Sequence, residues 1–110
     1  MKILFVIDDL VLGGAQHQMT NLAILLVKHY HNVTVLYYYN RNYFKTLLDH
    51  NKIDTKLLIV KKPIKRLFVF RRFIRREKYD LVISFLGTPN FLCEFAAFPY
   101  KTWKLIVNER

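Results

Sequence analysis

The sequence predicts a doubly wound α/β fold, in which helices cover both faces of a parallel sheet of about five strands in the order 3-2-1-4-5. Two apolar runs, residues 2–7 and 80–86, show no alternation of polar and apolar positions, which is typical of strands covered on both faces. Segments with helical spacing separate the strands, and this alternation favours parallel pairing. A chain of 110 residues corresponds to one domain.

The first half of the chain supplies two helices and the second strand. Apolar residues at steps of three and four predict a helix over residues 15–30, and β-branched and aromatic residues predict a strand over residues 32–39. A short polar helix is expected over residues 43–51.

The second half begins with a third strand predicted over residues 56–60. Pro63 suits the first turn of a helix that reaches residue 78. After the strand at 80–86, Thr88 is a candidate N-cap for a further helix, and residues 104–109 predict the fifth strand.

Composition and charge narrow the class of protein. The single cysteine excludes an internal disulfide and favours a reducing cytosol, and no segment is apolar enough over about 18 residues to span a membrane. The net charge of +10 is uneven: residues 56–110 hold 13 Lys and Arg against 4 Asp and Glu, whereas residues 1–55 hold 5 against 4. This basic region indicates an anionic partner.

The predicted strand order places a switch point between the first and fourth strands, and ligands bind outside the carboxyl ends of strands at such points. The loops there are residues 8–14 and 87–90. Gly13 and Gly14 precede a helix N-terminus, so they can adopt positive φ and approach a diphosphate, or they form only a tight turn. No third glycine completes a dinucleotide-binding motif.

Acidic and histidine side chains near this loop are further candidate site residues. Of the adjacent Asp8 and Asp9, one is expected to brace the loop while the other faces the cleft, or both only cap and solvate the loop. The four histidines are scattered and indicate no metal site; His17 lies in the first turn after the glycines.

The helix predicted from Pro63 is amphipathic and basic. Its apolar stripe is Ile64, Leu67, Phe70 and Ile74, and its opposite side carries Lys65, Arg72, Arg75 and Arg76. The basic side is either an ordinary solvated face or a patch for an anionic membrane or phosphate groups. Nucleic acid is not expected as a partner, because Phe68, Phe70 and Phe73 are assigned to the core.

Three segments resemble the N-terminal domain of family 4 glycosyltransferases, retaining enzymes of the GT-B architecture. They are MKILFVIDDLVLGGAQHQMTNLA, YDLVISFLGTPNFLCEFAA and LIVNER, and their order and spacing match over nearly the whole chain. The resemblance implies that residues 1–110 are one Rossmann-like, acceptor-binding domain, and that the donor-binding domain would follow Arg110 and is absent.

The resemblance also implies site residues and partners. It places Gly13, Gly14, Ala15 and Gln16 near the donor diphosphate, and it places Asp9, Thr88, Asn90 and Glu109 on the acceptor side. The donor would be a nucleotide sugar, with no further cofactor, and the acceptor a polysaccharide, glycan or lipid-linked glycolipid. The residues Ser84-Phe85-Leu86 replace a histidine-containing turn of the family, so no histidine role carries over.

Two functions therefore stand as expectations. The first is the acceptor-binding part of a cytoplasmic hexosyltransferase at the inner face of a membrane, inactive without a C-terminal half or partner chain. The second is a noncatalytic Rossmann-like binding module or degenerate remnant with a basic docking helix.

Overall fold

The computed structural model describes residues 1–85 and 104–108, and within them one parallel sheet forms the centre of the molecule. Its strands are β1 (Lys2–Val6), β2 (Asn32–Tyr37), β3 (Asp54–Leu57), β4 (Leu81–Phe85) and β5 (Lys104–Asn108). They lie in the order β3-β2-β1-β4-β5, and every neighbouring pair is parallel. The predicted fold class and strand order are confirmed.

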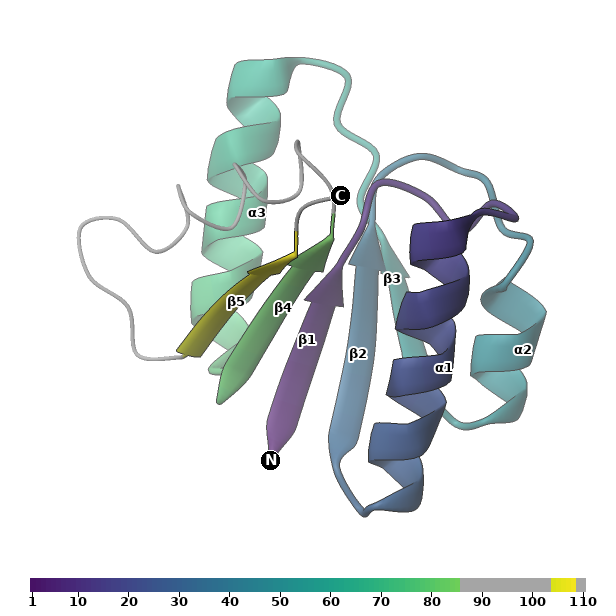
Figure 1. Ribbon diagram of the computed structural model, residues 1–110. Coiled ribbons are helices and arrows are strands. Elements are labelled where there is room, and N and C mark those ends of the chain that lie inside the picture. Colours follow the sequence, from purple (N-terminus) through teal and green to yellow (C-terminus); the bar gives the residue numbers. More distant parts are fainter. Residues whose placement is uncertain (86–103, 109–110) are drawn as a thin grey trace.

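Helices cover both faces of the sheet. The helices α1 (Gly14–Lys28) and α2 (Lys45–His50) lie on one face, and α3 (Pro63–Glu77) lies on the other (Figure 1). The carboxyl ends of all strands meet at one edge, which is also where α1 and α3 begin. The helix expected after Thr88 lies outside the described residues.

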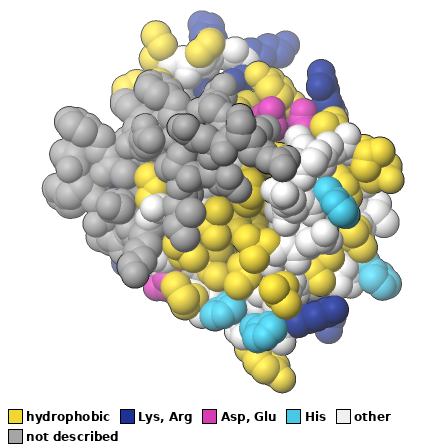
Figure 2. Space-filling model, in the orientation of Figure 1, with side chains coloured by type: hydrophobic (Ala, Val, Ile, Leu, Met, Phe, Trp, Pro, Cys, Tyr) yellow, Lys and Arg dark blue, Asp and Glu magenta, His cyan; other side chains and the backbone are white. Residues whose placement is uncertain are grey.

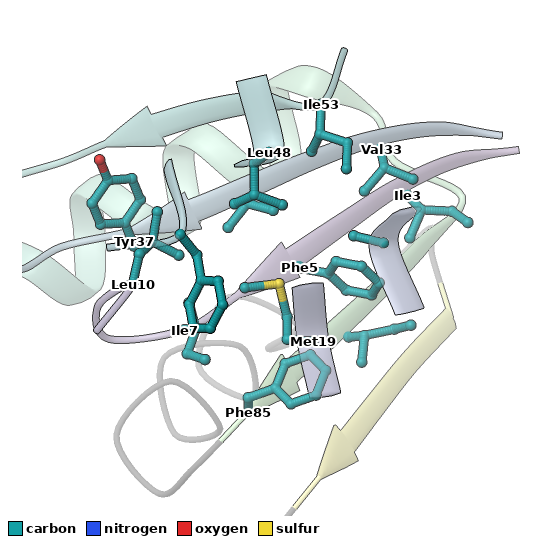
Figure 3. Packing of buried hydrophobic residues seen from close by; sticks show 14 residues of the cluster. Ile3, Phe5, Ile7, Leu10, Met19, Val33, Tyr37, Leu48, Ile53 and Phe85 are labelled. Atoms are coloured by element: carbon teal, nitrogen blue, oxygen red, sulfur yellow. The ribbon is translucent and has the colours of Figure 1, made fainter. Parts of the chain in front are cut away.

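Two hydrophobic cores hold the layers together, and β1 contributes to both. Ile3, Phe5 and Ile7 face α1 and α2, whereas Leu4 and Val6 face α3. In the first core, Phe5 packs edge-on against Phe85 of β4, and Met19 of α1 lies over them (Figure 3). Because side chains alternate between faces along a strand, an unbroken apolar run fills both cores at once.

The third strand differs from its prediction. It was expected over residues 56–60 but is found at Asp54–Leu57, where it pairs with the last residues of β2. This edge strand is only half buried, and Ile59 beyond it is exposed. Register with β2, rather than the local apolar run, therefore sets the position of the strand.

The C-terminus of α1 also differs from its prediction. The helix was expected to reach residue 30 but ends at Lys28, and Tyr30 is 96% exposed and has a φ of 67°. The amide of His31 donates to the carbonyl of Leu26 at 3.1 Å, which is the bond that closes a helix C-terminus around a left-handed residue. Tyr30 thus ends the helix instead of packing under it.

The start and the outer side of α3 do not reach the core. Phe70, Phe73 and Ile74 are buried and Leu67 packs partly against the same core, but Ile64 is 72% exposed and Phe68 is 59% exposed. The assignment of Phe68 to the core was therefore wrong. At its start α3 extends past the carboxyl ends of the strands (Figure 1), and Phe68, two positions from Phe70, lies on the opposite side of the helix. Residues 63–68, called the projecting half below, carry these two apolar side chains in solvent.

Candidate functional site

The loop after β1 is fastened to the loop after β2 at the carboxyl edge of the sheet. The carbonyl of Asp8 accepts the amide of Tyr39 at 2.9 Å, and the amide of Leu10 donates to the carbonyl of Arg41 at 2.8 Å. The carbonyl of Leu10 in turn accepts the amide of Phe44 at 3.0 Å. These bonds join the two loops into one rigid rim beside the predicted switch point. Because α1 begins there, it is called the α1 rim below.

A buried hydrogen bond between Asp9 and Gln16 closes the β1–α1 loop. Gln16 Nε2 donates to Asp9 Oδ1 at 2.9 Å, and both side chains are buried. Asp9 Oδ2 also lies 3.7 Å from the guanidinium of Arg41. Asp9, which was predicted to bind the acceptor, therefore braces the loop in this structure, and its acceptor role stays a prediction.

Gly13 is favoured by the position of the Gln16 side chain rather than by its own backbone angles. Its φ of −154° is extended, and none of the described glycines has positive φ, so neither Gly13 nor Gly14 uses the left-handed conformation that is open to a glycine. A Cβ at Gly13 would lie 2.6 Å from Gln16 Oε1. The glycine leaves room for the Gln16 amide to fold back toward Asp9.

The N-terminus of α1 opens at this rim. No side chain caps it, and its first turn contains no acidic residue. Gly14 is exposed and Gly13 is half-buried, whereas Ala15 and Gln16 are buried. An anion approaching the helix would therefore meet the backbone amides at the two glycines rather than the side chains of the next two residues.

Asp8 is the more accessible of the two adjacent carboxylates. Burial raises the pKa of Asp8 above its ordinary value, and the negative charge of Asp9 raises it further; the hydrogen bond from the Asp9 amide, at 2.9 Å, acts in the opposite direction. The sequence places both carboxylates after the first strand, and only the hydrogen bonds of the folded loop distinguish the engaged Asp9 from the more accessible Asp8.

The remaining predicted acceptor residues, Thr88, Asn90 and Glu109, lie outside the described residues.

The predicted basic patch is spread over three shallow hollows along α3. Arg72 and Arg76 share one, Arg75 lines a second, and Lys65 lines a third with Lys61 and Lys62. Figure 2 shows Lys and Arg side chains gathered at the upper rim, above two acidic side chains.

Arg66 does not contribute to this patch. Its guanidinium donates to the carbonyl of Val60 through Nε at 3.3 Å and Nη2 at 3.0 Å, and it stacks 4.6 Å from the ring centre of Tyr38. The side chain therefore fastens the start of α3 to the end of β2.

Within residues 1–85 and 104–108, no helix is long and apolar enough to cross a membrane. The same described ranges hold no group of three or more His, Cys, Asp or Glu side chains that could bind a metal ion.

Comparison with known proteins relates the chain to glycosyltransferases. No protein-family profile matches it. It is 31% identical, over 99% of its length, to a Campylobacter jejuni protein named GalNAc-alpha-(1->4)-GalNAc-alpha-(1->3)-diNAcBac-PP-undecaprenol alpha-1,4-N-acetyl-D-galactosaminyltransferase. The structure of a glycosyltransferase from Rickettsia africae superposes with a TM-score of 0.74 over 96% of the chain, at 17% identity.

The chain is therefore similar to glycosyltransferases in sequence and in fold. It spans 32% of the Campylobacter protein and 28% of the Rickettsia chain. The matched part in the Rickettsia structure has the same α/β fold.

Proposed function

We propose that this chain is the acceptor-binding, N-terminal domain of a retaining family 4 glycosyltransferase of the GT-B architecture. Such an enzyme moves a sugar from a nucleotide sugar to a polysaccharide or glycolipid acceptor. The observation that carries the proposal is the uncapped start of α1 behind Gly13 and Gly14, at the carboxyl edge of the central strand. The likeness to two glycosyltransferases supports it.

The rim suits one wall of a cleft for a diphosphate. Amides at a helix N-terminus attract negative charge, and the Asp9–Gln16 bond holds the loop in place before a ligand arrives. Preorganised groups of this kind lower the cost of ordering on binding. Asp8, half-buried beside them, is placed to accept a hydrogen bond from an acceptor hydroxyl.

The projecting half of α3 supports docking at the inner, cytoplasmic face of a membrane. Ile64 and Phe68 are exposed there, and Lys61, Lys62 and Lys65 surround the hollow at its base. Apolar side chains flanked by cations are typical of segments that lie in a membrane interface. Each cation near an anionic surface contributes about 1 kcal/mol. The relative's named acceptor contains a PP-undecaprenol group, and the same cations suit such a diphosphate.

The second candidate is a noncatalytic module that docks on membranes through α3. The separation of its surface from the α1 rim favours it, because α3 lies on the opposite face of the sheet from α1. The two candidates differ in whether the chain recognises the glycolipid itself.

Vesicle flotation distinguishes them. The purified chain is mixed with neutral vesicles, with anionic vesicles, and with neutral vesicles carrying a lipid-pyrophosphate-linked glycan. We expect the glycolipid to increase binding over neutral vesicles, and Lys62→Ala with Lys65→Ala to reduce binding about thirtyfold. Lys28→Ala with Lys52→Ala removes the same charge at the other edge of the molecule and serves as the control.

If anionic vesicles and glycolipid vesicles of equal surface charge bind the chain equally well, the chain does not recognise the glycolipid, and the noncatalytic docking module is the better description of its function. Equal losses for the two pairs of variants would show that net charge alone, and not α3, drives the association.

A further inference from the structure

The segment between β2 and α2 carries exposed aromatic and amide side chains that have no role in the proposed function. It reads Tyr-Asn-Arg-Asn-Tyr from Tyr39 to Tyr43. Tyr39 is 45% exposed and Tyr43 is 64% exposed, and the three residues between them are exposed as well. Two partly exposed tyrosine rings thus flank amide and guanidinium groups; the guanidinium of Arg66 lies over the ring of Tyr39 at 5.4 Å, and Tyr43 is the more exposed of the two.

Both tyrosine rings are held by aromatic neighbours. Tyr39 packs edge-on against Tyr38, with ring centres 4.8 Å apart, and Tyr43 packs edge-on against Phe44 at 4.9 Å. Phe44 is buried and stacks on His17 of α1 at 6.2 Å. A braced aromatic ring loses little conformational entropy when a ligand covers it.

The polar groups of the segment are ordered too. The hydroxyl of Tyr37 donates to Asn42 Oδ1 at 2.6 Å, and Asn42 Nδ2 donates to Asn40 Oδ1 at 2.7 Å. This chain of bonds engages both amide atoms of Asn42 and the Oδ1 of Asn40. The Nδ2 group of Asn40, on an exposed residue, takes no part in it and can donate to a hydroxyl or acetamido oxygen of a ligand.

A hollow of about 430 Å³ adjoins Tyr43. Its walls are mainly apolar, and Thr46 and His50 add polar atoms at its border; the lining residues are Tyr43, Phe44, Thr46, Leu47 and His50. An apolar wall with a few polar groups is the usual form of a small-molecule site.

The cations of this region are neutralised. Lys45 Nζ lies 2.6 Å from Asp49 Oδ2, and the guanidinium of Arg41 lies 3.7 Å from Asp9. A partner rich in phosphate would need unpaired cations here, whereas a neutral partner would not. The charges therefore favour a sugar over a nucleic acid, although both could stack on tyrosine.

We infer that Tyr43 and the hollow beside it form a carbohydrate-binding subsite for a neutral sugar unit of a glycan, with an N-acetylhexosamine, the unit in the name of the Campylobacter relative, as the test ligand. The apolar C–H face of the sugar stacks on Tyr43, and its hydroxyl and acetamido groups bond to polar atoms at the border. The inference rests on the proposed function, in which the subsite holds acceptor units away from the reacting end. His17, in the first turn of α1, connects the hollow to the rim through Phe44.

An NMR titration of the isotope-labelled chain with the disaccharide GalNAc-α-1,4-GalNAc tests the subsite. We expect amide signals of Tyr43, Leu47 and His50 to shift. Tyr43→Ala should weaken binding about tenfold, because it removes the stacking face. Leu47→Lys, which covers the hollow without touching the buried Leu48, should weaken it as well. Tyr43→Phe keeps the ring and should bind like the parent chain, as should Tyr30→Ala at the opposite edge.

Absence of disaccharide binding, or full binding by Tyr43→Ala, would overturn the subsite. Shifts of the same signals by a single-stranded oligonucleotide alone would overturn its assignment to carbohydrate. If Tyr43→Ala leaves disaccharide binding intact while glycolipid vesicles still capture the chain, only the subsite is wrong. If the disaccharide binds as expected but the glycolipid vesicles capture nothing extra, the subsite stands and the acceptor proposal fails.

Discussion

Gly13 is constrained by a neighbouring side chain, and this can be measured. A methyl group at Gly13 would lie 2.6 Å from Gln16 Oε1, so in Gly13→Ala the amide that binds Asp9 has to shift. Complete loss of a partner by a buried carboxylate costs about 1–3 kcal/mol. We expect Gly13→Ala to lower the free energy of unfolding by up to that amount in urea titrations.

The double-mutant cycle with Gln16→Ala tests the cause. Once Gln16 is truncated, Gly13→Ala should change stability by less than about 0.5 kcal/mol, because nothing remains to be displaced. Gln18→Ala, on the exposed side of the same helix, is the matched control and should be nearly neutral. An equal loss from Gly13→Ala in both backgrounds would mean that the backbone at Gly13, and not Gln16, requires glycine.

The raised pKa of Asp8 makes the free energy of unfolding decrease as the pH rises. Burial, reinforced by Asp9, raises this pKa above the ordinary 3.8, so the folded chain holds the proton more tightly than the unfolded chain does. Ionised Asp8 therefore destabilises the fold, fully so above its raised pKa and not at all below 3.8.

We expect Asp8→Asn to raise the free energy of unfolding at pH 7, with the gain shrinking as the pH is lowered toward 3.8. Urea titrations across this range measure the gain, and Asp54→Asn on the exposed edge of β3 provides the comparison. A loss of stability in Asp8→Asn at pH 7 would mean that the ionised carboxylate is needed for the loop.

The helix α3 has a side that packs on the sheet and a side that faces solvent. Phe70 is fully buried against the sheet, whereas Phe68, two positions earlier and on the opposite side of the helix, is 59% exposed. Phe70→Ala should cost about 3–5 kcal/mol through lost burial and the cavity left behind. Phe68→Ala should cost less than about 0.5 kcal/mol, as is usual at the surface.

The same pair separates stability from membrane docking. Phe68→Ala should weaken capture by anionic vesicles while its thermal unfolding stays close to that of the parent chain. Similar destabilisation by the two substitutions would show that the projecting half of α3 packs against the molecule and is not available for docking.

Some of these helices and strands can be predicted from the sequence, and others cannot. The strands β1 and β4 were predictable because burial on both faces leaves a local signature, an apolar run without alternation. The position of β3 was not, because register with β2 decides it. The helical spacing of the apolar residues in α3 is visible in the sequence, but the point at which the sheet ends beneath the helix depends on the whole fold.

The candidate site was predictable only in part. The glycines and the adjacent aspartates are visible as a pattern, and the switch point follows from strand order. The bond between Asp9 and Gln16 joins residues seven positions apart across a turn, so only the folded loop shows which aspartate is engaged. The tyrosines after β2 gave a strand signal, and their exposure depends on where β2 ends, at Tyr37.

As a whole, the chain matches about a third of each glycosyltransferase to which it is similar. In the proposed enzyme, the α1 rim binds one side of the donor diphosphate, and other groups must hold the sugar that is transferred. Positioning both reactants is worth an effective concentration on the order of 10⁵ M or more, which a domain that binds the acceptor alone would not supply.

We therefore expect the purified 110-residue chain to bind glycolipid vesicles and yet to transfer no sugar to them. The assay supplies a nucleotide-activated N-acetylgalactosamine and a lipid-pyrophosphate-linked glycan, and it follows lengthening of the glycan by mass spectrometry. The Campylobacter transferase, run in parallel on its own acceptor, shows that the reagents support transfer. Lengthening by the 110-residue chain above the enzyme-free background would mean that these residues hold both substrates, and the assignment to an acceptor-binding domain would fail.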